Sequence, residues 1–106
     1  MTYEAFREQP LFSEWEGSVP LDVIEAARRI MLDTVAKLEG LGPPPASDAV
    51  LDILRQCVEA FNDLDETDGP WIETIEREDL CAMVDQLATL AGIEDADDIA
   101  GEWRDW

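Results

Sequence analysis

Residues 20–61 run PLDVIEAARRIMLDTVAKLEGLGPPPASDAVLDILRQCVEAF, and this stretch decides the fold. Its first half places apolar residues at helical spacing, and two glycines and three prolines then end the pattern. The same spacing restarts after Ser47, which suits a helix N-cap. We therefore expect two amphipathic helices, over 20–41 and 47–61, joined by a short stiff connector. Their apolar stripes are Ile24, Ala27, Met31, Val35 and Leu38 in the first and Val50, Leu54, Cys57, Val58 and Phe61 in the second.

The flanking segments complete an all-α architecture. A third helix is expected to begin near Thr74 or Glu76 and to stop by Gly92, because its first turn is acidic and its apolar residues keep helical spacing. Residues 95–106 are expected to hold a short helix, and residues 1–19 to form an aromatic-rich arm, irregular or with a short helix. No stretch alternates apolar and polar residues as a strand does. The predicted fold is a small helical bundle of three main helices, a short C-terminal helix and an aromatic N-terminal arm.

Charge and composition exclude several classes of partner. The 106 residues include 26 acidic and seven basic side chains and no histidine, which gives a net charge of -19. The length predicts one domain over 1–106. A surface this negative repels nucleic acid and anionic lipid, and it attracts cations or a basic protein. The chain also lacks the commonest general base and transition-metal ligand, histidine. We therefore expect a basic protein partner, no nucleic acid, no membrane and no cofactor.

Compartment and thiol chemistry follow from the absence of recognisable signals. No apolar run approaches the ~20 residues that a bilayer span needs. The N-terminal segment lacks the positive-then-apolar layout of a secretion signal, so a cytoplasmic location is expected. Cys57 and Cys81 lie inside helical patterns and form no CxxC motif. We expect two small buried thiols on facing helices.

Residues 62–70 form a run of turn-forming and acidic residues after the second helix. They resemble the opening of an EF-hand calcium loop. Counting Gly69 as loop position 6 puts isoleucine at position 12, where glutamate is needed, and counting from Asp63 puts Asp68 where glycine is needed. We interpret the run as a solvated acidic turn. The run and the turn that follows it supply the candidate partner-binding residues, with an indole as apolar anchor: Asp63, Asp65, Glu66, Asp68, Trp71, Glu73 and Glu76.

The four tryptophans divide into expected core residues and possible anchors. Trp71 and Trp103 are expected to be mostly buried. Trp15 lies between two glutamates and Trp106 lies in an acidic segment, where an indole could give a basic partner apolar contact area.

Two carboxylate pairs suggest a different function. Glu73 and Glu76 form ExxE, and Glu102 and Asp105 form ExxD, a spacing that puts each pair on one helix face. The pairs resemble the metal-binding signature of the all-α nucleoside triphosphate pyrophosphohydrolases, the MazG-like family. The resemblance covers these four residues and implies a magnesium-dependent hydrolase that uses them as ligands. It departs from the family because the ExxD pair lies in the last residues rather than on a long central helix, and no basic cluster could hold a triphosphate.

The function that we expect is a non-enzymatic, acidic protein-binding module. Its most concrete form is an immunity- or antitoxin-like inhibitor, or a DNA mimic, that covers the basic cleft of a nucleic-acid-acting protein. This is similar to bacterial nuclease immunity proteins in charge, size and helicity, while no sequence motif of theirs is present. The alternatives are the magnesium-dependent hydrolase and a self-associating domain, a homodimer that buries an apolar face of the C-terminal segment. Nucleophilic catalysis is not expected, because no histidine can activate the three serines.

Overall fold

A computed structural model describes residues 2–106 of the chain. Within this range the secondary structure is helical and no strand is present, which confirms the predicted all-α fold. The elements are α1 (Tyr3–Glu8), η1 (Ser13–Trp15), α2 (Leu21–Gly40), α3 (Ser47–Asp68), α4 (Thr74–Leu90) and η2 (Ile99–Glu102), where η marks a 3₁₀-helix.

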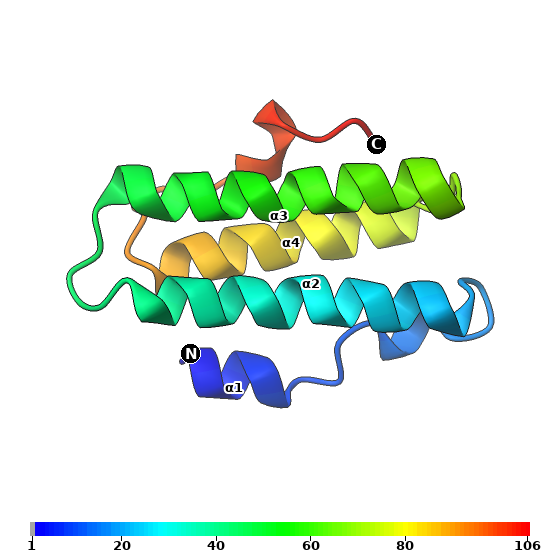
Figure 1. The fold of residues 1–106 in the computed structure, drawn as a ribbon, viewed down its shortest axis with the longest axis horizontal. Helices are drawn as coiled ribbons and strands as arrows, with labels where there is room; N and C mark the ends of the chain where they lie inside the picture. The colour runs from blue at the N-terminus through cyan, green and yellow to red at the C-terminus, as the bar shows by residue number, and fades with distance from the viewer. Residues whose placement is uncertain (1) are drawn as a thin grey trace.

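The three long helices lie side by side along the long axis of the molecule (Figure 1). α1 packs beside α2, and the C-terminal segment crosses over α3 and α4. The α2–α3 connector and the loop after α4 lie at one end of the bundle. The start of α2, the end of α3 and the start of α4 meet at the opposite end. This second end therefore brings together segments that are far apart in the sequence.

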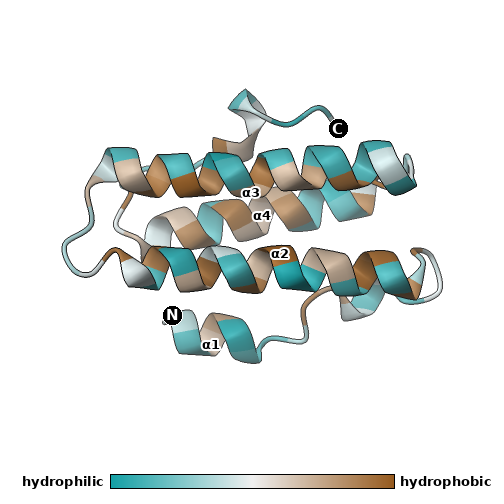
Figure 2. Cartoon of the chain, in the orientation of Figure 1, coloured by the Kyte–Doolittle hydropathy of each residue, from teal (hydrophilic) through white to brown (hydrophobic). Residues whose placement is uncertain are grey.

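One apolar stripe from each long helix forms the core. Brown and teal bands alternate along these helices in Figure 2, as expected for helices that bury one face. Every stripe residue predicted for the first two helices is buried, from Ile24 to Phe61. The third predicted stripe is buried as well, and it consists of Leu80, Val84, Leu87, Ala88 and Ala91.

The N-terminal arm packs against the bundle through its aromatic side chains, as predicted. Phe6, Phe12 and Trp15 are all buried, and the rings of Phe12 and Trp15 stack with centroids 4.0 Å apart. The indole Nε1 of Trp15 donates a hydrogen bond to Asp79 of α4, 2.8 Å away. The backbone carbonyl of Leu11 accepts a hydrogen bond from Arg28 of α2 at 2.7 Å. Trp15 is therefore a core residue, although two glutamates flank it in the sequence.

The prediction of an acidic turn over 62–70 is wrong for most of its length. α3 continues through Asp68, well beyond the predicted end at Phe61. Leu64 lies three residues after Phe61 and is half-buried against the core, so the apolar stripe extends into the acidic run. The helix ends where Pro70 restricts the residue before it. Ser47 is also not the N-cap, because Ala46 occupies that position and Ser47 is the first helical residue.

The C-terminal segment forms less helix than predicted. Its helical part is the four residues of η2, and a non-helical stretch follows. The side chain of Asn62 on α3 holds the backbone of the stretch that follows η2. Its amide nitrogen donates to the carbonyl of Trp103 at 2.9 Å, and its amide oxygen accepts from the backbone N–H of Asp105 at 3.0 Å. These bonds satisfy backbone groups that a longer helix would otherwise pair internally.

The two cysteines differ in burial. Cys57 is buried on α3, as predicted, whereas Cys81 on α4 is only half-buried, and both are free thiols. Across residues 2–106, no helix combines the length and the apolar character needed to cross a membrane.

Candidate functional site

The end of α3, the short connector after it and the start of α4 bring most of the predicted partner-binding residues to one end of the bundle. We call this surface the acidic end and define it by five exposed carboxylates: Asp63, Glu66, Asp68, Glu73 and Asp105. Asp105 belongs to it because Asp105 and Glu66 line one surface depression, together with Asn62 and Pro70. Helix α3 thus presents its carboxylates near its C-terminus, where the helix dipole disfavours negative charge.

Two of the predicted partner-binding carboxylates hold the backbone of this end in place. Asp65 Oδ1 accepts hydrogen bonds from the backbone N–H groups of Trp71 and Ile72, both at 2.8 Å. Glu76 is 7% exposed, and its Oε1 accepts a hydrogen bond from the backbone N–H of Glu73 at 2.9 Å. The Glu73 side chain accepts one from the backbone of Glu76, so the ExxE pair forms the capping box of α4. Asp65 and Glu76 therefore have a structural role.

Trp71 is buried, as predicted, and this burial changes its expected role as an anchor. Its side chain is 8% exposed and lies against Trp15, with ring centroids 5.4 Å apart. Its indole Nε1 donates to the carbonyl of Leu64 at 3.4 Å. Trp106 is buried too, at 9% exposure, while Trp103 is half-buried. The indoles of Trp15, Trp71 and Trp106 thus offer a partner little free surface.

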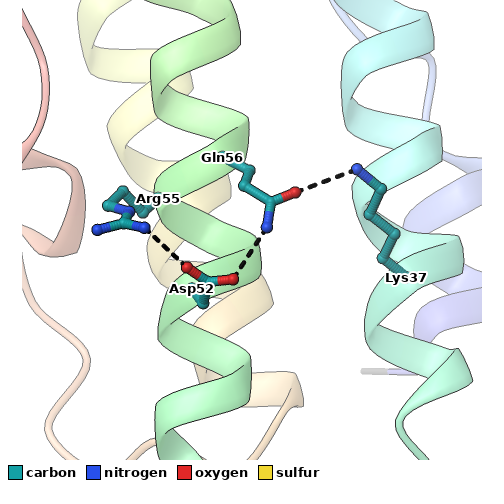
Figure 3. A network of polar contacts seen from close by, with 4 residues as sticks. All are labelled: Lys37, Asp52, Arg55 and Gln56. Carbon is teal, nitrogen blue, oxygen red and sulfur yellow. Dashed lines mark hydrogen bonds and ion pairs between the residues drawn. The ribbon is translucent and has the colours of Figure 1, made fainter.

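The carboxylates of the acidic end take part in no ion pair within residues 2–106. Among residues 2–106 the ion pairs are Arg7–Glu39, Arg28–Glu16 at 3.9 Å and Arg55–Asp52 at 2.9 Å. They all involve residues before the acidic end. Figure 3 shows one such compensated area, where Asp52 bonds Arg55 and Gln56, and Gln56 accepts a bond from Lys37 on α2. The cations that form these ion pairs therefore lie outside the acidic end.

The four residues of the ExxE and ExxD pairs do not form a metal centre in this structure. Glu102 and Asp105 are exposed, at the end of η2 and in the stretch after it. Glu73 and Glu76 are bonded to the backbone of α4. Throughout residues 2–106, no three Cys, Asp or Glu side chains are grouped as ligands of one metal ion.

Sequence reasoning missed an apolar component at the same end. Ile75 and Leu21 are 62% and 64% exposed, the highest values among the exposed large apolar residues of the described chain. Ile75 precedes Leu80 by five residues, which places it off the apolar stripe of α4 and could have been recognised from the sequence. It lies in an open cleft of about 510 Å³ lined by Ser18, Pro20, Asp68, Pro70, Trp71, Glu73, Thr74, Ile75 and Glu76.

Comparisons of the chain with protein-family models, with curated proteins and with solved structures found no match.

Proposed function

We propose that this protein is a non-enzymatic binding module whose acidic end engages a positively charged protein surface. The observation that carries the proposal is the distribution of charge. Of the 26 carboxylate side chains, 22 are exposed, and the ion pairs of the described chain leave those of the acidic end unpaired. A cationic partner would neutralise them.

Electrostatics favours such a complex in two ways. The exposed carboxylates repel one another, and those at the C-terminus of α3 also oppose the helix dipole, so a cationic partner relieves both unfavourable terms. A concentrated negative field also steers a basic partner toward this end and raises the association rate. An inhibitor of a nucleic-acid-acting protein fits this description, because its carboxylates would take the place of phosphates in a basic cleft. This is the strategy of an immunity protein, an antitoxin or a DNA mimic.

A charge-matched pair of variants tests the proposal. One variant carries Asp63→Asn, Glu66→Gln and Asp68→Asn at the acidic end. Its control carries Glu94→Gln, Asp95→Asn and Asp97→Asn, which remove the same charge from exposed positions of the loop after α4, at the opposite end of the bundle. The probes are purified basic nucleases and DNA-binding proteins, and the readouts are association rate and inhibition of nucleic-acid binding or cleavage.

We expect the acidic-end variant to lose roughly tenfold or more in association rate with a bound probe, and the control to lose much less. The difference between the variants should shrink as NaCl is raised, because salt screens exposed charges. Equal losses in the two variants would show that net charge, and not the acidic end, drives association. Absence of binding to every probe would contradict the proposal.

A further inference from the structure

We infer that the cleft beside Ile75 receives a segment of the partner in which an apolar side chain is flanked by lysine or arginine. This inference rests on the proposed function and names the chemistry of the partner at the acidic end. The cleft combines two kinds of surface. Its apolar walls are the rings of Pro20 and Pro70 and the side chain of Ile75, and its exposed carboxylates are Asp68 and Glu73.

The exposure of Ile75 argues for an apolar contact. Most large apolar side chains of this chain are buried or half-buried, whereas Ile75 leaves 62% of its surface in water. Leu21 follows the cleft-lining residue Pro20 in the chain and is 64% exposed. Apolar side chains that gather on a surface with a polar rim mark interaction sites. A purely ionic contact would leave this apolar surface exposed to water.

The charge around the cleft indicates which kind of segment can bind there. No lysine or arginine lines it, so a wholly apolar segment would desolvate Asp68 and Glu73 without giving them a partner. A second copy of this chain would bring another net charge of -19 and would be repelled. A segment with a leucine-like side chain between cationic ones complements both the apolar walls and the carboxylates of the cleft. The apolar group covers Ile75, and the cations pair with the carboxylates.

Two synthetic peptides test the inference. One is a short peptide of lysines and arginines with a central leucine, and the other carries serine in place of that leucine. Each is titrated against the unaltered protein, against Ile75→Ser, and against Leu41→Ser. Leu41 is 37% exposed and follows the last residue of α2, at the opposite end of that helix from Leu21, so it is a matched control. Far-UV circular dichroism verifies that each variant remains folded.

For the unaltered protein we expect the leucine peptide to bind roughly fivefold to tenfold more tightly than the serine peptide, which corresponds to partial burial of one large apolar side chain. Ile75→Ser should remove this preference and leave the affinity for the serine peptide unchanged. Leu41→Ser should preserve it. The preference should also persist at high salt, since burial of apolar surface is not screened.

Four results would overturn the inference, and they are distinguishable. Equal affinity for the two peptides would leave the proposed function in place and show that the contact is purely ionic. A preference that survives Ile75→Ser would place the apolar contact elsewhere. A dimer in sedimentation equilibrium that dissociates in Ile75→Ser would identify a second copy as the occupant. Failure of both peptides to bind would also count against the proposed function.

Discussion

Individual carboxylates in this protein have two distinct roles. Most are exposed, but Asp65, Glu76, Asp79 and Asp85 are buried or half-buried and accept hydrogen bonds. Asp79 holds the indole of Trp15, and Asp85 accepts from the backbone N–H groups of Asp98 and Ile99 at 3.0 and 2.9 Å. Hydrogen bonds to a charged acceptor are stronger than neutral ones, so these four residues contribute to the fold despite the high negative charge.

Cys57 should make the protein less stable as the pH becomes alkaline. Burial raises the pKa of this thiol from 9.0 to about 11, although hydrogen bonding to Thr34 and the charge of Lys37 oppose the shift. The unfolded chain therefore releases the proton before the folded protein does. Stability should be unaffected below about pH 9 and should fall between about pH 9 and about pH 11, by about 2 kcal/mol from this residue.

The measurement is chemical denaturation across this pH range for the unaltered protein and for Cys57→Ala. The variant is expected to be less stable at neutral pH because it leaves a cavity, and its stability should decline less steeply with pH. Cys81→Ala serves as the control for the half-buried thiol. Parallel pH profiles for the unaltered protein and Cys57→Ala would contradict the expectation.

At the level of elements, the contact between α3 and α4 depends on a short connector and one side chain. Asp65 on α3 accepts two backbone hydrogen bonds from the residues that lead into α4. Gly69, which follows α3, is required by close approach: a Cβ atom there would lie 2.4 Å from the backbone nitrogen of Trp71 and 2.5 Å from the backbone oxygen of Asp65. The geometry of the acidic end is therefore set by the Asp65 side chain and by the close approach of the backbone at Gly69.

Asp65→Ala should destabilise the protein by about 2 kcal/mol or more, because it leaves two backbone N–H groups next to the core without an acceptor. Asp63→Ala, which removes the same charge from an exposed neighbour, should change stability by no more than about 0.5 kcal/mol. Urea denaturation followed by tryptophan fluorescence measures both. Asp65→Asn should restore part of the loss, since its amide oxygen can still accept. Similar losses of stability at positions 63 and 65 would show that removal of negative charge, rather than loss of the two hydrogen bonds to Asp65, is responsible.

For the molecule as a whole, the dominant feature is a net charge of -19 spread over exposed carboxylates. The buried stripes of three helices supply the favourable free energy of folding, and repulsion among the carboxylates opposes it. The few ion pairs lie on exposed side chains and contribute little, since surface pairs are worth about 0–1 kcal/mol. The stability of the free protein should therefore depend strongly on ionic strength.

Raising NaCl from about 10 mM to about 300 mM should increase the melting temperature, as screening weakens the repulsion. The triple variant at Asp63, Glu66 and Asp68 should melt at a higher temperature than the unaltered protein in low salt and should gain less from added salt. Choline chloride should act as NaCl does, because screening requires no specific cation. A melting temperature that does not change with salt would contradict this account of the free protein.

The sequence by itself determined the fold class and the core, because helical periodicity and proline breaks are local signals. It predicted the apolar stripes of the three long helices, and the residues of these stripes are buried as expected. It also predicted the packed aromatic arm, in which Phe6, Phe12 and Trp15 are buried. It also determined the net charge, which follows from composition.

Tertiary structure decided how the acidic residues are used. The continuation of α3 through Asp68 depends on Leu64 meeting the core, and the path of the chain after η2 depends on Asn62 bonding a segment some forty residues later in the chain. The burial of Trp15 and Trp106, which the sequence offered as anchors for a partner, likewise follows from how the N-terminal arm and the C-terminal segment pack against the bundle. Spacing along a chain specifies which face a residue occupies on its own helix, but only packing between helices determines which faces remain in water.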